Sequence, residues 1–176
     1  MAQTQLIVHG VTSLEEARYF AAMGADWIGF QADGLPLERI RSISSWVVGP
    51  RTFIEFESAG EDDLFQADQQ LQPDGMMLPA GEFPPWYQGV RIHRGATPEG
   101  HLPDTDISYG PSGTVSDAAD FKHLWLSIDT AHFQEALQAL PAAPLGIVIT
   151  CTGTGDAIDF DVYDNIIGTY QDWLRH

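Results

Sequence analysis

Residues 6–30 read LIVHGVTSLEEARYFAAMGADWIGF, and this stretch decides the fold class. Its first part, Leu6–His9, is a short apolar run of the kind that forms a buried strand. N-cap candidates follow at Thr12-Ser13, and the apolar side chains after them recur at helical spacing until Gly24. A second apolar run, Trp27–Gln31, comes next. The stretch therefore predicts a strand, a helix and a second strand, which is one βα unit opening into the next.

The rest of the chain alternates in the same way. Eight strands alternating with helical stretches indicate parallel β/α units, and eight such units predict an α/β fold of the closed (β/α)8 TIM barrel type. The further predicted strands are Thr52–Phe56, Gly75–Leu78, Gly89–His93, Thr105–Tyr109, Leu124–Ile128 and Leu145–Thr150, and the further predicted helices are Pro36 to about Val47, Asp62–Leu71, one or two turns over Ser116–Lys122, Thr130–Leu140 and Asp161–Leu174.

The chain is short for such a barrel. It has 176 residues, whereas typical barrels run from about 200 to over 250 residues. The shortage falls around strands 4 to 6, where the segment GEFPPWYQ at positions 81–88 holds two prolines and cannot be a regular helix. We expect residues 1–176 to form one domain, a trimmed barrel with one or two outer helices missing. The rival is an open doubly wound sheet, which no Gly-rich dinucleotide fingerprint supports.

The charge of the chain restricts its partners. It has 25 acidic and 8 basic residues, a net charge of −17 that repels nucleic acid and anionic membrane surfaces. No apolar run is long enough for a membrane span, and the start does not read as a signal peptide. The single cysteine, Cys151, cannot form an internal disulfide and is expected to be a buried, inert thiol. We therefore expect a cytoplasmic protein without nucleic-acid or membrane partners.

The opening segment also carries a family resemblance. Its Ile7–Thr12 hexapeptide reads IVHGVT, and Gly24-Ala25-Asp26 and Gly29-Phe30 follow the helix. This pattern resembles the start of phosphoribosylanthranilate isomerase, which reads K-I-C-G-I-T, then an acidic alanine-rich helix, G-A-D and G-F. The match is specific over roughly the first 33 residues and thin beyond them. The resemblance implies a barrel related to an enzyme of tryptophan biosynthesis that performs an Amadori rearrangement, an internal aldose-to-ketose isomerisation.

The resemblance also implies catalytic positions. In that family a cysteine on strand 1 acts as general base and an aspartate on strand 6 as general acid. Here His9 replaces the cysteine, and a histidine can serve as a base near neutral pH. The acid position falls near Tyr109, with Asp106 as a neighbour, and the family's lysine becomes Ile7. The catalytic candidates are thus His9, Tyr109 and Asp106; for His9 the alternative is a hydrogen-bonded histidine without chemistry.

One of the two expected phosphate loops is altered. In such barrels the loops after strands 7 and 8 present backbone N–H groups to a phosphate, and glycines allow its close approach. The family's glycine pair after strand 7 is replaced by Ile128-Asp129-Thr130, which sets a negative charge beside the phosphate. After strand 8, Thr150, Thr152 and Gly153 can still donate hydrogen bonds.

Further candidates follow from the expectation that strand ends meet at the barrel mouth. An inward Glu55 needs a partner, and Arg51, Arg91 or His93 are available. The two arginines that flank His93, Arg91 and Arg94, suit the binding of an anion. No close metal-ligand motif is present, so no metal or other cofactor is expected. The predicted substrate-binding residues are Gln31, Glu55, Arg91, His93, Asp129, Thr150, Thr152 and Gly153.

Three classes of function remain open. The first is a working isomerase with His9 as general base. The second is a barrel of the same descent with a different small-molecule activity. The third is a non-catalytic descendant that binds a ligand or a partner, including a homodimer, because missing outer helices would expose apolar surface. We predict a divergent barrel that lacks the parent isomerisation and has a ligand-binding, partner-binding or altered, sugar-phosphate-like role. Whether it is an enzyme stays open.

Overall fold

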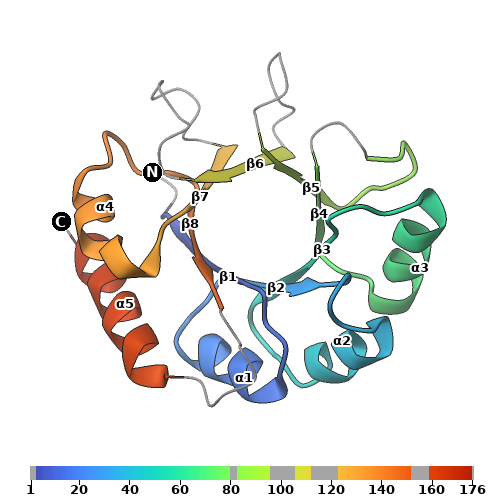
Figure 1. The fold of residues 1–176 in the computed structure, drawn as a ribbon, viewed down its shortest axis with the longest axis horizontal. Helices are drawn as coiled ribbons and strands as arrows, with labels where there is room; N and C mark the ends of the chain where they lie inside the picture. Colours follow the sequence, from blue (N-terminus) through green and yellow to red (C-terminus); the bar gives the residue numbers. More distant parts are fainter. Residues whose placement is uncertain (1–2, 80–82, 96–105, 112–122, 152–158, 176) are drawn as a thin grey trace.

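Eight parallel strands form a closed barrel in sequence order, with β1 paired to β8 (Figure 1). The computed structural model describes residues 3–79, 83–95, 106–111, 123–151 and 159–175. The predicted (β/α)8 barrel is confirmed, and the open doubly wound sheet is wrong, because β8 closes on β1 over five residue pairs, from Gln5 with Gly146 to His9 with Thr150.

Most elements lie within one or two residues of their predicted bounds. The strands are β1 Gln5–His9, β2 Trp27–Gln31, β3 Arg51–Glu55, β4 Gly75–Pro79, β5 Val90–Arg94, β6 Asp106–Pro111, β7 Leu124–Ser127 and β8 Gly146–Thr150, and the helices are α1 Leu14–Ala22, α2 Leu37–Ser44, α3 Glu61–Leu71, the 3-10 turn η2 Thr130–His132, α4 Phe133–Gln138 and α5 Phe160–Trp173.

Two predicted helices are shorter than expected. Helix α2 ends at Ser44 instead of continuing to about Val47. The predicted helix Thr130–Leu140 is divided, because Asp129 accepts a hydrogen bond from the Ala131 N–H and starts a 3-10 turn before the α-helix begins. The turns predicted over 116–122 lie outside the described residues.

Helix α1 shows how the opening sequence fixes its local structure. The Ser13 hydroxyl accepts a hydrogen bond from the Glu16 N–H at 3.2 Å, and the Glu16 carboxylate accepts one from the Ser13 N–H at 2.9 Å. This capping box satisfies two N–H groups that the first helical turn leaves free. At the other end, Gly24 has φ +85°, a left-handed conformation that lets the chain turn into β2.

The barrel interior is filled by side chains. Each strand contributes one residue to a buried inner cluster, and three of these are large aromatic residues whose rings contact one another. The ring centroids lie 5.1 Å apart for Trp27 and Trp125, 5.4 Å for Phe53 and Trp125, and 6.3 Å for Trp27 and Phe53. The interior therefore has no room for a ligand, and in barrels of this fold active sites lie at the mouth formed by the carboxyl ends of the strands. The cluster consists of Ile7, Trp27, Phe53, Met77, Ile92, Ile107, Trp125 and Val148.

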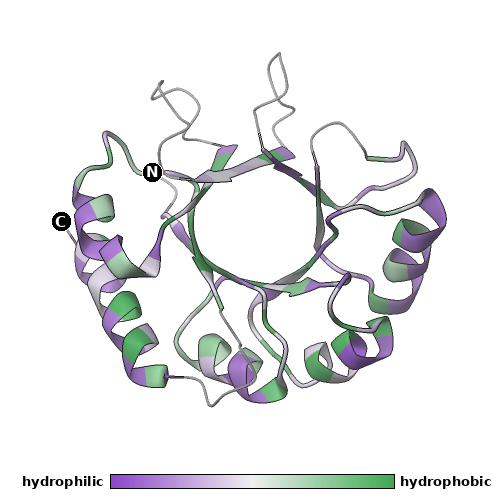
Figure 2. Ribbon diagram, viewed as in Figure 1, coloured by the Kyte–Doolittle hydropathy of each residue, from purple (hydrophilic) through white to green (hydrophobic). Residues whose placement is uncertain are grey.

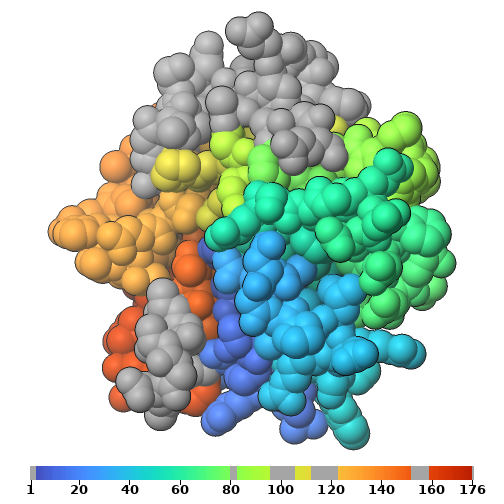
Figure 3. Space-filling view, turned by 45° about the vertical axis from the view of Figure 1, so that its right-hand side comes forward, coloured from blue at the N-terminus to red at the C-terminus, as the bar shows by residue number. Residues whose placement is uncertain are grey.

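The described helices cover only part of the barrel. Helices α4, α5, α1, α2 and α3 follow one another around it, and α2 and α3 lie side by side (Figures 1 and 3). Their apolar positions lie among polar ones, as expected of helices that cover a barrel with one face (Figure 2). Between β4 and β7 the described residues contain no α-helix. The expected trimming is thus confirmed.

The segment before β5 covers the core in place of a helix. Tyr87 is buried in the outer core and stacks on Phe83, with ring centroids 5.9 Å apart. Trp86 packs its ring against Phe65 of α3 and donates a hydrogen bond to Glu61. These aromatic residues therefore cover a part of the barrel over which no helix is described.

Candidate functional site

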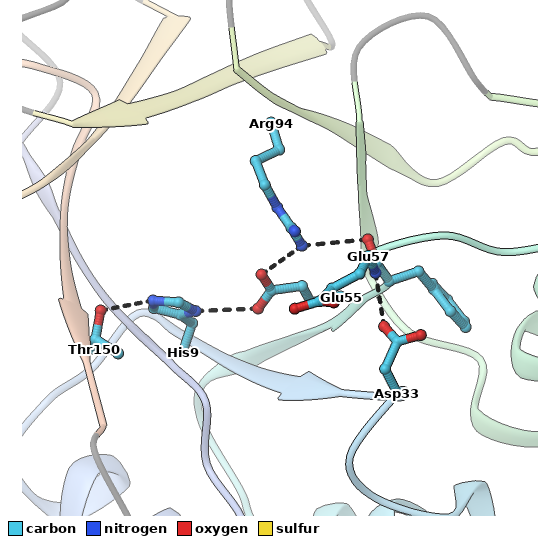
Figure 4. Close-up of polar contacts among 7 residues, drawn as sticks. His9, Asp33, Glu55, Glu57, Arg94 and Thr150 are labelled. Carbon is cyan, nitrogen blue, oxygen red and sulfur yellow. Dashed lines mark hydrogen bonds and ion pairs between the residues drawn. The ribbon is translucent and has the colours of Figure 1, made fainter.

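His9 lies at the carboxyl end of β1 and faces the barrel mouth, because Ile7 two residues earlier faces the interior. Its Nδ1 lies 3.0 Å from Glu55 Oε2, and its Nε2 lies 2.7 Å from Thr150 Oγ1 (Figure 4). The three residues come from β1, β3 and β8. Both ring nitrogens of His9 are therefore engaged by the protein itself.

Glu55 is the centre of this network and is 3% exposed. Besides His9, it accepts a hydrogen bond from Arg94 Nη2 at 2.5 Å, and the same guanidinium nitrogen donates to the Phe56 carbonyl at 3.2 Å (Figure 4). Burial alone would raise the pKa of the Glu55 carboxyl, but the His9 hydrogen bond and the charges of His9 and Arg94 outweigh it and hold the pKa below its usual value. Glu55 is therefore ionised near neutral pH.

The ionised carboxylate fixes the orientation of the imidazole. A carboxylate only accepts hydrogen bonds, so His9 Nδ1 carries the proton that Glu55 binds. In the neutral ring Nε2 is then an acceptor, and the Thr150 hydroxyl donates to it. In that neutral form the Nε2 lone pair points at Thr150.

Two further predicted residues belong to this end of the barrel. Tyr109 of β6 places its ring edge-on to His9, with centroids 5.8 Å apart. Burial raises the pKa of its phenol, against a lowering by the Ser127 hydrogen bond, so the phenol stays protonated. Gln31 ends β2 in register with Glu55. The sequence thus placed His9, Tyr109, Glu55, Thr150 and Gln31 at the mouth correctly.

Three predicted residues lie on the opposite face of their strands. His93 Nε2 lies 3.0 Å from Asp106 Oδ2, and the His93 ring contacts Phe83. Arg91 donates to the Tyr87 carbonyl at 3.0 Å. Because Ile92 and Ile107 face the interior, their neighbours Arg91, His93 and Asp106 face outward. They therefore do not lie beside Glu55 at the mouth, and the expectation that Arg91 or His93 pairs with Glu55 is wrong.

Arg94 is the mouth residue that the sequence did not assign. The predicted strand ended at His93, whereas β5 runs to Arg94. Successive side chains lie on opposite faces of a strand, so with Ile92 in the interior Arg94 faces inward and His93 outward. The third expected partner of Glu55, Arg51, lies at the other end of β3, where its guanidinium stacks over Trp27 at 5.3 Å from the ring centroid.

The remaining predicted residues have other positions. Asp129 follows β7, and its exposed carboxylate accepts the Ala131 N–H at 3.0 Å as the cap of η2. Thr152 and Gly153 lie outside the described residues. Cys151 is buried, and burial raises the pKa of its thiol to about 12, as expected for an inert thiol.

A small pocket lies next to the network. Its volume is about 190 Å³, which is below the 300 Å³ or so of a typical small-molecule site. Residues at the ends of β2 and β3 and on α2 and α3 line the pocket: Ala32, Asp33, Leu37, Phe56, Ser58, Ala59, Asp63 and Gln66.

The described residues contain no group of three or more His, Cys, Asp or Glu side chains that could hold a metal ion. No helix in the described part of the chain is long and apolar enough to cross a membrane.

Comparison with solved structures identifies relatives of the fold. Similar structures include phosphoribosylanthranilate isomerase from Thermotoga maritima, with 16% identity and a TM-score of 0.74, and the enzyme from Pyrococcus furiosus, with 13% identity and a TM-score of 0.75. A phosphoribosylanthranilate isomerase in complex with reduced 1-(o-carboxyphenylamino)-1-deoxyribulose 5-phosphate is 15% identical, with a TM-score of 0.70. Each alignment covers 96% of this chain and 99% of the other. No protein-family model and no curated protein matches the sequence. The chain has the fold of the phosphoribosylanthranilate isomerases.

Proposed function

We propose that this chain is a divergent phosphoribosylanthranilate isomerase-like barrel that binds a small, sugar-phosphate-like ligand at its mouth and lacks the Amadori isomerisation. The observation that carries the proposal is the engagement of both ring nitrogens of His9, by Glu55 at 3.0 Å and by Thr150 at 2.7 Å. A general base must reach the proton that it removes. In this geometry the first proton within reach of His9 Nε2 is that of Thr150.

The acid side of the site supports the same proposal. The inward position of β6 next to His9 holds Tyr109, not a carboxyl group. Burial raises the pKa of this phenol, which makes it a poorer proton donor near neutral pH. The nearby carboxylate, Asp106, pairs with His93 on the outer face. The mouth therefore does not hold the cysteine base and the aspartate acid that the resemblance to the isomerase family implies.

Ligand binding is supported by the polar groups that remain at the mouth. Thr150, Gln31 and the guanidinium of Arg94 lie at the carboxyl ends of β8, β2 and β5, which is the end where barrels of this fold bind ligands. A related structure was solved with a reduced deoxyribulose 5-phosphate compound bound. That compound is therefore a suitable probe for this chain.

The test measures binding and turnover with the same purified protein. We expect the reduced 1-(o-carboxyphenylamino)-1-deoxyribulose 5-phosphate to bind in calorimetry, and His9→Ala to weaken that binding. We expect no turnover of phosphoribosylanthranilate and no rescue of a strain that lacks the isomerase. His132→Ala, a change of an exposed histidine on η2, is the matched control and should leave binding unchanged. Failure of the compound and of ribose 5-phosphate to bind would overturn the ligand proposal.

The second candidate is an active phosphoribosylanthranilate isomerase with His9 as general base. The edge-on approach of Tyr109 to His9 favours it, because the two rings could serve as acid and base across a bound sugar. Rescue of the strain together with turnover by the purified protein would establish this candidate and exclude the first.

Assembly belongs to the same proposal. One of the similar structures is described as monomers generated from a dimeric phosphoribosylanthranilate isomerase of Thermotoga maritima. We propose a homodimer for this chain as well, to be checked by sedimentation of the purified protein.

A further inference from the structure

Three side chains at the mouth form a continuous line from hydroxyl to imidazole to carboxylate. We propose that Thr150 is a nucleophile activated by His9 and that the mouth transfers or hydrolyses the acyl group of a small ester. The inference rests on the proposed function only in placing the ligand at the mouth. It adds a reaction class that differs from isomerisation.

The distances suit this role. Thr150 Oγ1 lies 2.7 Å from His9 Nε2, and Glu55 Oε2 lies 3.0 Å from His9 Nδ1 (Figure 4). Both values lie within the range of about 2.6–3.2 Å in which a base accepts a proton from a nucleophile and is oriented by a third group. Such a set is recognised by geometry and roles, not by its order along the chain.

The barrel holds these groups rigidly. His9 and Thr150 are partners in the register of β1 and β8, and the Cys151 N–H donates to the His9 carbonyl at 2.8 Å. Glu55 is fixed from its other side by Arg94. Reactive groups placed on neighbouring strands with fixed partners need little reorganisation when a substrate binds.

The electrostatics fit the same roles. The carboxylate of Glu55 keeps a proton on Nδ1, which leaves the Nε2 lone pair for the hydroxyl proton, and it stabilises the imidazolium that forms. Tyr109 lies edge-on to His9, and burial raises the pKa of its phenol, so a neutral ring and not a second charge adjoins the imidazole. Thr150 and His9 are the catalytic residues of this proposal, and Glu55 is a positioning residue.

The reaction balances without an oxidant or a metal. Thr150 Oγ forms a bond to the ester carbonyl carbon while its proton moves to His9 Nε2. The bond from that carbon to the alcohol oxygen breaks, and the leaving alcohol takes the proton from Nε2. Water then attacks the acyl carbon and gives a proton to His9 Nε2. The bond from that carbon to Thr150 Oγ breaks, and Nε2 returns the proton to Oγ, which releases a carboxylic acid and restores the Thr150 hydroxyl.

The test traps the acyl intermediate on the intact chain. The folded protein is incubated with p-nitrophenyl acetate, and the acetylated residue is located by peptide mass spectrometry. We expect acetyl on Thr150, its loss in Thr150→Val, and its retention on the new hydroxyl in Thr150→Ser. Thr169→Val, which changes a half-buried threonine of α5, is the matched control and should keep the label on Thr150.

The base and the positioning residue are tested by rate. We expect His9→Ala to slow acetylation of Thr150 by about a hundredfold. Glu55→Gln should slow acetylation as well, and Glu55→Asp should recover part of the rate, while circular dichroism shows that each variant is folded. If Glu55 were purely structural, the variants would differ in folding but not in this order of acetylation rates.

Absence of acetyl from Thr150 in the folded chain, or labelling that His9→Ala leaves unchanged, would overturn the inference. Binding of the deoxyribulose 5-phosphate compound is measured separately. If that binding persists while acetylation fails, the proposed function survives and only the acyl-transfer inference falls.

Discussion

Glu55 carries a full charge at a position that is 3% exposed. A buried carboxylate is tolerated only when hydrogen bonds and opposite charges replace the water that it has lost. His9 and Arg94 do so, one on each oxygen. Because His9 takes its orientation from this carboxylate, the direction of the Nε2 lone pair and the place of Thr150 depend on Glu55.

Loss of the charge should therefore destabilise the fold and should do so in a defined pH range. We expect Glu55→Gln to lower the free energy of unfolding by about 3 kcal/mol near neutral pH, because it leaves Arg94 without its anion. The folded pKa of Glu55 is lowered, so its stabilisation is complete above the unfolded pKa of about 4.3. That stabilisation is lost as the pH falls through the lower, folded value.

Urea unfolding followed by tryptophan fluorescence, repeated across this range, measures both effects. Glu57→Gln removes an exposed carboxylate two residues along the chain and should change the free energy by no more than about 0.5 kcal/mol. A difference between wild type and Glu55→Gln that persists unchanged in acid would contradict the assignment of an ionised, paired Glu55.

At the scale of elements, the sequence predicted well which helices and strands are present and in what order. It predicted less well which side chains of a strand face the barrel interior. The Ser13 cap stands directly before α1, Gly24 follows directly after the residue that caps its end, and β2 coincides with its apolar run, so the bounds of α1 and β2 could be predicted from local chemistry. Which side chains of a strand face the interior depends on how the strands pair with one another. One residue at the end of β5 decided whether His93 or Arg94 reaches the mouth, and no local signal marks that residue.

The end of α1 offers a test of the local argument. Gly24 has φ +85°, and a Cβ added there meets nothing within 4 Å, so only backbone conformation opposes a side chain. We expect Gly24→Ala to cost about 1 kcal/mol or more in unfolding free energy. Gly34→Ala is the control, because Gly34 is equally open but lacks a positive φ, and it should be close to neutral. Equal effects of the two changes would show that the left-handed conformation is not what requires glycine.

At the scale of the whole molecule, one packing arrangement positions every mouth residue. The three aromatic rings in the interior are larger than the aliphatic side chains around them. The Phe53 ring fits because the neighbouring strand β2 carries a glycine, which has no side chain, beside it. Gly29 of β2 lies in register with Phe53, and a Cβ at Gly29 would stand 2.1 Å from the end of the Phe53 ring. The sequence did not predict this fit, because it depends on which residues face each other across a closed barrel.

The fit makes Gly29→Ala a test of the closed interior. A side chain can yield to a new methyl group only if space lies behind it, and the Phe53 ring is in contact with both Trp27 and Trp125. We therefore expect a loss of about 1–3 kcal/mol in unfolding free energy from overpacking. The same substitution at Gly168, in α5 with nothing within 4 Å, should instead stabilise by about 0.5–1 kcal/mol, because alanine favours a helix over glycine. Urea unfolding of both variants decides the question: if Gly29→Ala were as stable as wild type, the interior would have room to move, and the rigid placement of His9, Glu55 and Thr150 at the mouth would lose its physical basis.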